Sequence, residues 1–178
     1  MGQLIATTQA TLDGVIDPVG EWVEPDGDHG VWSFERQRRS AGLVLGRKTF
    51  EGLAGYWPNE TGRWADLVNG MRKWVGSTTL SGALPWNGTL LDDPLEQSIP
   101  RLKEEVEGDL FMHGSGDFAW ALASRGLVDL FEIYLNPLVW GRGNLHVLGD
   151  RGTVRMQLEE VRRFDSGVVL LTYLPRRG

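Results

Sequence analysis

Short apolar runs recur along the chain, and most of them are bounded by glycine, proline or small polar residues. Runs of this length and composition are typical of buried strands. They predict strands over residues 3–8, 42–45, 73–76, 88–91, 109–113 and 130–135. The last part of the chain predicts two more strands, over residues 154–164 and 168–174, joined as a hairpin by Asp165-Ser166-Gly167.

Segments with a helical spacing of apolar residues lie between these strands. They predict helices over residues 29–40, 48–53, 64–71, 94–107 and 117–125. In the first of these, Val31, Phe34 and Arg38 share a face, and Asp28 stands where a helix N-cap is expected. Strands that alternate with helices predict an α/β fold, with a mostly parallel sheet and an antiparallel edge made by the C-terminal hairpin. In such sheets, ligands bind at the carboxyl ends of the strands.

Composition narrows the classes of function. The 178 residues suffice for one domain with a sizeable core, and the net charge of −6 argues against nucleic acid or an anionic membrane as the partner. The chain has no cysteine, which excludes thiol catalysis and disulfides. The histidines His29, His113 and His146 are too widely spaced to predict a metal site. No stretch resembles a secretory signal or a membrane span, so cytoplasm is the expected compartment.

Three of the predicted strands end in turns suited to a phosphate. Leu45-Gly46-Arg47-Lys48-Thr49 leads into a helix, whose first N–H groups and two cations attract anions. Gly76-Ser77-Thr78-Thr79 offers hydroxyls, and Gly114-Ser115-Gly116 places small residues between a strand and a helix. Each turn also has a plainer interpretation: a solvated basic pair, an ordinary Ser/Thr turn and a tight connection. Their joint occurrence in one α/β chain favours a shared ligand site.

An ordered series of short motifs resembles the dihydrofolate reductase-like superfamily. In chain order the motifs are Leu4-Ile5-Ala6, Leu12-Asp13-Gly14, Leu45-Gly46-Arg47-Lys48-Thr49-Phe50-Glu51, Tyr56-Trp57-Pro58, Ser77-Thr78-Thr79-Leu80, His113-Gly114-Ser115-Gly116, Gly126-Leu127-Val128-Asp129, Asn136-Pro137-Leu138-Val139 and Gly141-Arg142-Gly143. The chain looks most like small single-domain proteins related to the reductase domain of the bifunctional riboflavin-biosynthesis enzyme. The likeness runs through nearly the whole chain and implies a three-layer sandwich.

The resemblance implies NADPH as the cofactor and a small molecule as the substrate. By their place in the motifs, the residues that would contact the cofactor are Ala6, Gly46, Arg47, Lys48, Thr49, Ser77, Thr78, His113, Gly114, Ser115 and Gly116. The turn at residues 76–79 would lie near the adenosine 2′-phosphate. The turn at residues 114–116 would lie near the pyrophosphate. The resemblance also implies a homodimer. The apolar segment 130–139 would supply its interface, unless that segment packs inside the domain.

The chain departs from the superfamily where a proton donor is expected. In dihydrofolate reductases an acid stands sixteen residues before the glycine that matches Gly46, and here that position is Gly30. The candidate catalytic acids are therefore Asp28 and Asp13, although a helix cap is the commoner role for Asp28. The candidate substrate contacts are Trp32, Glu35 and Trp57, although simple packing is the commoner role for a tryptophan such as Trp57.

The sequence thus predicts an NADPH-dependent reductase of a small, flat heterocycle, pteridine-like or pyrimidine-like. Hydride would pass to a C=N or C=O carbon. Two other interpretations stay open. One is a protein that binds NADP(H) without catalysis, such as a redox sensor, which the missing acid at position 30 favours. The other is a module that uses the same turns to bind a different phosphate-containing ligand.

Overall fold

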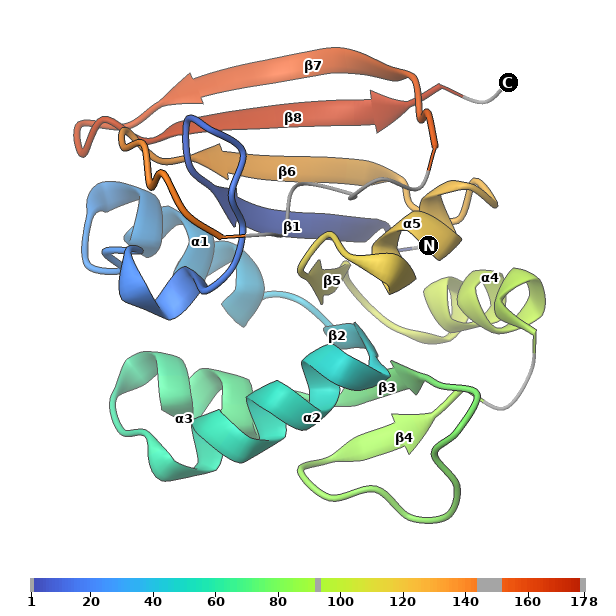
Figure 1. Cartoon of the computed structure of the whole chain (residues 1–178). Helices are drawn as coiled ribbons and strands as arrows, with labels where there is room; N and C mark the ends of the chain where they lie inside the picture. The colour runs from blue at the N-terminus through green and yellow to red at the C-terminus, as the bar shows by residue number, and fades with distance from the viewer. Residues whose placement is uncertain (1, 92–93, 144–151, 177–178) are drawn as a thin grey trace.

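The computed structural model describes residues 2–91, 94–143 and 152–176. Within these residues, eight strands form one sheet in the order β4-β3-β2-β5-β1-β6-β8-β7 (Figure 1). The strands are β1 (Leu4–Ala10), β2 (Gly42–Gly46), β3 (Lys73–Gly76), β4 (Gly88–Leu90), β5 (Leu110–His113), β6 (Leu130–Leu135), β7 (Met156–Arg163) and β8 (Val169–Pro175). The first six strands in the sheet order, β4-β3-β2-β5-β1-β6, run parallel to one another. β8 is antiparallel to both β6 and β7. The mostly parallel sheet with an antiparallel C-terminal edge is therefore confirmed.

Helices cover both faces of this sheet. The described helices are α1 (Asp28–Arg38), α2 (Arg47–Tyr56), α3 (Arg63–Gly70), α4 (Leu95–Glu105) and α5 (Asp117–Ala123), with the short 3-10 helices η1 (Val19–Glu21) and η2 (Trp57–Asn59). Successive side chains of a strand point to opposite faces of the sheet. The apolar clusters on the two faces place α4 and α5 on one side and α1, α2 and α3 on the other. The result is the predicted three-layer sandwich.

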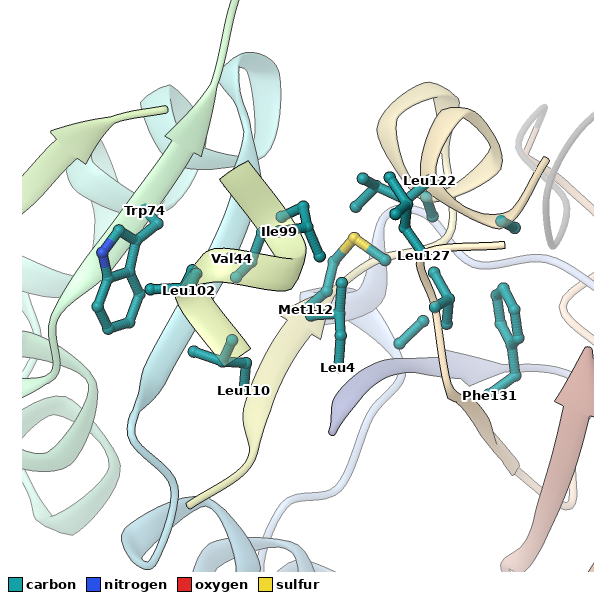
Figure 2. Close-up of a cluster of buried hydrophobic side chains, with 14 residues drawn as sticks. Leu4, Val44, Trp74, Ile99, Leu102, Leu110, Met112, Leu122, Leu127 and Phe131 are labelled. Carbon is teal, nitrogen blue, oxygen red and sulfur yellow. The ribbon is translucent and has the colours of Figure 1, made fainter. Parts of the chain in front are cut away.

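Apolar side chains fill the space between the sheet and each layer of helices. Figure 2 shows Leu4 and Met112 of the sheet beside Ile99 of α4 and Leu122 of α5. These four residues are at most 1% exposed. The opposite cluster, under α2 and α3, includes Leu43, Leu45, Phe50, Val68 and Val75. Burying side chains of this size contributes about 1.5–3 kcal/mol each, so the two clusters hold the strand ends in fixed positions.

The first helix differs from its prediction in both its start and its buried face. Asp28 is the first residue of α1, and Gly27 takes the N-cap position in its place. Val31 is 47% exposed, whereas the buried residues of α1 are His29, Gly30 and Gln37. The predicted face was wrong because the side of α1 that meets the sheet is polar, and an apolar pattern does not mark such a side.

The apolar segment 130–139 supplies an interior strand of the sheet. Strand β6 pairs with β1 on one side and with β8 on the other, so both of its edges are occupied. Phe131 and Tyr134 are each 1% exposed. Packing within the sheet therefore explains the apolar character of residues 130–135, whereas Val139 beyond the strand is 68% exposed, and the homodimer stays a prediction.

Candidate functional site

The three predicted turns lie side by side at the carboxyl edge of the parallel strands. β3, β2 and β5 are consecutive in the sheet, and Gly46 at the end of β2 pairs with Gly76 at the end of β3. Gly114 follows His113, the last residue of β5, and its N–H donates to the carbonyl oxygen of Thr7 in β1 at 3.0 Å. Because parallel strands all end at the same edge of a sheet, the fold brings together the three turns that the sequence analysis grouped.

Helix α2 starts directly after β2, beside the turn formed by residues 114–116. Thr49 Oγ1 lies 3.9 Å from the position that a Cβ would take at Gly114. Lys48 Nζ lies 3.9 Å from Asp117 Oδ2 at the start of α5, and both side chains are exposed. Arg47 binds a glutamate one turn further along α2 at 2.9 Å. The first N–H groups of α2 and the Lys48 ammonium therefore lie next to the 114–116 turn, and Arg47 adds a second cation at the start of the same helix.

The glycines of these turns serve two different purposes. A Cβ at Gly46 would lie 2.6 Å from the Cβ of Phe118, and a Cβ at Gly76 would overlap the Phe118 ring. These two glycines allow α5 to pack against the ends of β2 and β3. Gly114 has a φ of +89°, in the left-handed region that favours glycine. Among the described residues, no atom lies within 4 Å of a Cβ position at Gly116, so the 114–116 turn borders open space.

The turn after β3 has the local hydrogen bonds of a Ser/Thr turn, and one of its hydroxyl protons is available to a ligand. The Ser77 hydroxyl accepts the N–H of Thr79 at 3.1 Å and the N–H of Leu80 at 2.9 Å. Its own hydrogen is directed either to the Thr79 hydroxyl, 3.4 Å away, or to another acceptor. Thr78 is exposed. A hydroxyl proton of this turn is thus available to an anion at the edge of the sheet.

His113, directly before the 114–116 turn, and Ser115, within it, connect the turn to neighbouring elements. His113 Nε2 lies 2.7 Å from Gln37 Oε1 of α1, and burial lowers the pKa of His113 to about 4. The imidazole is therefore neutral at pH 7, with the Nε2 hydrogen assigned to the amide oxygen, which can only accept. Ser115 is 2% exposed, and its hydroxyl lies 3.5 Å from Thr8 Oγ1 of β1.

Asp13, a predicted catalytic acid, is held by three donors. Its carboxylate accepts the Thr11 hydroxyl at 2.5 Å, Gly141 N at 2.8 Å and Trp140 N at 3.1 Å. The bond from Thr11, followed by those from Gly141 and Trp140, lowers the pKa of Asp13 to about 2. A carboxyl group this acidic carries no proton near neutral pH. These contacts favour an anchoring role, in which Asp13 ties the segment around residue 140 to the end of β1.

Asp28, the other predicted acid, joins α1 to the C-terminal hairpin. It accepts Asp165 N at 2.7 Å and Ser166 N at 3.2 Å in the turn between β7 and β8. Burial alone would raise the pKa of Asp28, but the bonds from Asp165 and Ser166 leave it below its ordinary value. The contacts again favour a structural role, and a catalytic role for either aspartate stays a prediction.

The three predicted substrate contacts lie in different surroundings. Trp32 of α1 packs on the apolar cluster beneath the C-terminal hairpin, and its ring centre lies 4.0 Å from the guanidinium carbon of Arg162. Glu35, which is 44% exposed, binds Arg38 at 2.7 Å. Trp57 packs against the cluster under α2 and α3, as the packing interpretation expects. The fold therefore does not gather these three residues around one point.

A polar row, which the sequence analysis missed, crosses the sheet beneath α1. His113 of β5 pairs with Thr7 of β1. Thr7 pairs in turn with Glu132 of β6, which pairs with Thr172 of β8. Thr7, Glu132 and Thr172 are at most 9% exposed, and Glu132 Oε1 lies 2.8 Å from Arg36 Nη2 of α1. The sequence does carry a signal for this row, because a glutamate interrupts the strand LFEIYL where a buried strand predicts an apolar residue.

Comparison with protein families identifies the chain. The model of the RibD C-terminal domain family matches residues 3–170. The chain belongs to the RibD C-terminal domain family. The uncharacterized protein YyaP of Bacillus subtilis (strain 168) is 26% identical to it over 180 residues, which cover 96% of this chain and 94% of YyaP.

Solved structures show the same fold at low sequence identity. One is the diaminohydroxyphosphoribosylaminopyrimidine deaminase/5-amino-6-(5-phosphoribosylamino)uracil reductase of Thermotoga maritima, with a TM-score of 0.67 and 18% identity over 98% of this chain and 57% of that chain. Another is the dihydrofolate reductase of Enterococcus faecalis complexed with NADP(H), with a TM-score of 0.61 and 18% identity over 99% and 98% of the two chains. The dihydrofolate reductase-like fold implied by the motifs is therefore confirmed.

This member of the RibD C-terminal domain family has no room for a side chain at position 30. A Cβ at Gly30 would overlap the carbonyl oxygen of Pro25, in the loop that precedes α1. The loop thus occupies the place where the resemblance to dihydrofolate reductases expects an acid. Among the described residues, no three His, Asp or Glu side chains form a group that could hold a metal, and His146 lies outside those residues. Over the same residues, no helix has the length and apolar character needed to cross a bilayer.

Proposed function

We propose that this protein is an NADPH-dependent reductase of a small, flat heterocycle of the pteridine or pyrimidine class. The observation that carries the proposal is the meeting of the turns after β2, β3 and β5 at one edge of a dihydrofolate reductase-like sheet. That edge presents a helix start, two cations, an available hydroxyl proton and an open glycine turn. Membership of the RibD C-terminal domain family and the likeness to a reductase solved with NADP(H) support the proposal.

The residues at this edge fit a dinucleotide that carries an additional phosphate. The first N–H groups of α2, together with Arg47 and Lys48, would hold the pyrophosphate, and the 114–116 turn would border it from the β5 side. The Ser77 hydroxyl would donate to the 2′-phosphate, and the backbone of Ala6 in β1 would lie against the nicotinamide. When bound, NADPH supplies the hydride that adds to a C=N or C=O carbon.

The protein's own side chains would orient the acceptor and control its proton. Neutral His113 stands at the end of β5, and α1 covers the sheet beside it, which shields that region from water. Asp13 is unsuited to deliver a proton because its pKa is about 2. The proton gained by the reduced acceptor would therefore come from water or from a buried acid.

Binding of NADP(H) without catalysis, as in a redox sensor, is a second candidate function. The contact between position 30 and Pro25 favours it, because it excludes an acid where dihydrofolate reductases carry one. Such a protein would bind NADPH but would not oxidise it with any acceptor. A module for a different phosphate-containing ligand would show no preference for NADPH.

Titration of the purified protein with NADPH and NADH tests the cofactor, with nicotinamide fluorescence excited through the tryptophans as the signal. We expect NADPH to bind at least about tenfold more tightly, because its 2′-phosphate adds charge-assisted hydrogen bonds. Arg47→Ala should weaken the binding of both nucleotides by about tenfold, since it removes a positive charge from the pyrophosphate that NADPH and NADH share. Gly114→Val should weaken both, because a φ of +89° suits only glycine.

Arg39→Ala is the matched control for Arg47→Ala. Arg39 is 75% exposed and stands between α1 and the start of β2, at the opposite edge of the sheet. Its removal should leave both affinities unchanged. A protein that binds neither nucleotide would overturn the reductase proposal. Tight NADPH binding without oxidation by any of a panel of pteridines and pyrimidines would favour the sensor instead.

A further inference from the structure

The polar row beneath α1 lies in otherwise apolar surroundings. On the same face of the sheet, the neighbouring buried or partly buried side chains are Ile5, Phe111, Leu130, Tyr134 and Leu170. A carboxylate in such a place loses its hydration, which is costly and which a well-packed apolar side chain would avoid. The row ends at His113, directly before the 114–116 turn. It therefore links the space beneath α1 to the edge proposed to hold the cofactor.

Within this row, Glu132 has bonding capacity that the described residues do not use. Its side chain is 1% exposed, and neither carboxylate oxygen accepts a well-directed hydrogen bond from a described residue. Arg36 Nη2, 2.8 Å from Oε1, supplies an opposite charge. Burial raises the pKa of Glu132, and the charge of Arg36 opposes that rise. A carboxylate offers about four acceptor positions, so Glu132 has room for donors from a ligand.

The group that faces Glu132 is itself flat and carries paired donors. The guanidinium carbon of Arg36 lies 5.7 Å from the centre of the Phe111 ring and 6.0 Å from that of the Trp32 ring. The Arg36 side chain is 30% exposed, so it has a route toward solvent. A guanidinium presents two N–H groups on one carbon, an arrangement that matches a carboxylate and lies well on aromatic faces. A heterocycle with an N–C–N edge has the same two properties.

We propose that Glu132 recognises the N–C–N edge of a flat heterocyclic substrate, and that the Arg36 guanidinium takes the place of that edge in the free protein. The proposal rests on the proposed function and names the substrate class for the same site: an aminopyrimidine or related ring with two adjacent N–H donors. Binding exchanges one N–C–N group for another on the same carboxylate while Arg36 turns toward solvent. Glu132 pairs with Thr7, the residue after Ala6 on β1, so the ring would be held close to the proposed nicotinamide position.

The test uses 6-aminouracil, in which the ring N1–H and the amino group form such an edge. The control compound, 6-amino-1-methyluracil, lacks the N1–H. Binding to the wild type, Glu132→Gln and Arg36→Met is measured by calorimetry at pH 8. We expect the wild type to prefer 6-aminouracil by at least about tenfold. Glu132→Gln should weaken that binding by at least about tenfold, whereas Arg36→Met should strengthen it, because the competing guanidinium is gone.

Glu160→Gln is the matched control for Glu132→Gln. Glu160 belongs to β7, the edge strand of the sheet, where it pairs with Thr172 of β8. Its side chain is 52% exposed. Its substitution should leave the binding of 6-aminouracil unchanged. If the Arg36–Glu132 pair is only structural, both variants will lower the melting temperature and neither will alter binding, which overturns the proposal. If Glu132→Gln does not fold, Arg36→Met decides: tighter binding supports the proposal, and unchanged or absent binding overturns it.

NADPH titration of the same variants separates this proposal from the reductase proposal. Glu132→Gln and Arg36→Met should bind NADPH as the wild type does, because Arg36 belongs to α1 and Glu132 to β6, and neither residue is part of the three turns. Unchanged NADPH binding with unchanged 6-aminouracil binding would overturn the role of Glu132 alone. A wild type that fails to bind NADPH would overturn the reductase proposal, while the response of 6-aminouracil binding to the variants would still decide the role of Glu132.

Discussion

Gly30 and Glu132 illustrate how the atoms directly around a residue determine its chemistry. The carbonyl oxygen of Pro25 fills the position of a side chain at Gly30, so position 30 of α1 can carry no acid. Two turns later the same helix carries Arg36, which lies against a buried carboxylate of the sheet. The acidic group beneath α1 therefore belongs to β6 rather than to the helix.

His113 should make the stability of the protein depend on pH in a defined window. Burial lowers its folded-state pKa to about 4, compared with 6.5 for an unperturbed histidine. Below pH 6.5 the unfolded chain takes up a proton that the folded protein does not accept until about pH 4. The free energy of unfolding should therefore fall by up to about 3 kcal/mol as the pH is lowered through this window.

Urea denaturation at a series of pH values, with His113→Gln for comparison, checks this expectation. The variant has no imidazole, so its stability should change less steeply between pH 6.5 and pH 4. Asp13 affects the pH dependence of stability only at lower pH, because its pKa is lowered from 3.8 to about 2. Equal slopes for the wild type and His113→Gln would show that the folded protein protonates His113 normally.

At the site, the positions of the turns were predictable from local sequence, whereas the partners of the carboxylates were not. Glycine, serine and lysine after an apolar strand are local signals, and the fold brings those turns together. Asp13 and Asp28 were predicted as acids because the sequence shows a carboxylate but not its donors. Of those donors, Gly141 and Asp165 lie more than a hundred residues away in the chain. Glu132 was missed because its partner and its burial both depend on how α1 lies on the sheet.

At the scale of elements, Lys73 of β3 closes the end of α3. Its side chain is fully buried, and its ammonium group donates to the carbonyl oxygens of Val68, Asn69 and Met71. The last carbonyl groups of a helix have no partner within the helix. The first residue of a strand thus supplies the C-terminal cap of the helix before it, which fixes the angle between α3 and β3.

Lys73→Met should lower the free energy of unfolding by about 2 kcal/mol, because it leaves buried carbonyl oxygens without a donor. Urea denaturation followed by circular dichroism measures the loss. Arg72→Met is the matched control: Arg72 is exposed, and its guanidinium carbon lies 4.8 Å from the centre of the Trp74 ring. That variant should lose less than about 1 kcal/mol. Similar losses in both variants would contradict a capping role for Lys73.

The strands were predicted more accurately than the face of the first helix. Strands β3 and β6 have the predicted bounds, because a short apolar run between turn residues identifies a buried strand with little ambiguity. The inner side of α1 carries His29, Arg36 and Gln37, each with a polar partner or an opposite charge on another element. A polar interface of this kind has no apolar periodicity, so its pattern favoured Val31 and Phe34 instead.

At the scale of the whole molecule, the C-terminal hairpin fixes the start of α1. Asp28 accepts N–H groups from Asp165 and Ser166, and His29 Nδ1 lies 2.9 Å from the Ser166 hydroxyl. The hairpin also covers the outer edge of β6 through β8. The position of α1 over the polar row therefore depends on residues at the far end of the chain (Figure 1).

Asp28→Ala should loosen this connection. The amide hydrogens of Asp165 and Ser166 should exchange on the order of tenfold faster, because their acceptor is lost and the turn opens more readily. Hydrogen exchange followed by NMR measures the change. Asp26→Ala is the control, since Asp26 is exposed in the loop before α1. Unchanged exchange at Asp165 and Ser166 in Asp28→Ala would mean that other contacts hold the turn.

The contact between Asp28 and Asp165, 137 positions apart in the chain, also imposes an order in time. A chain leaves the ribosome from its N-terminus, so the strands that carry the three turns are complete once residue 116 has emerged. At that stage α1 still lacks the hairpin that anchors its start, and Glu132 has not yet emerged. The newborn protein can therefore assemble one half of its site early, while the other half waits until the hairpin that carries Asp165 has emerged.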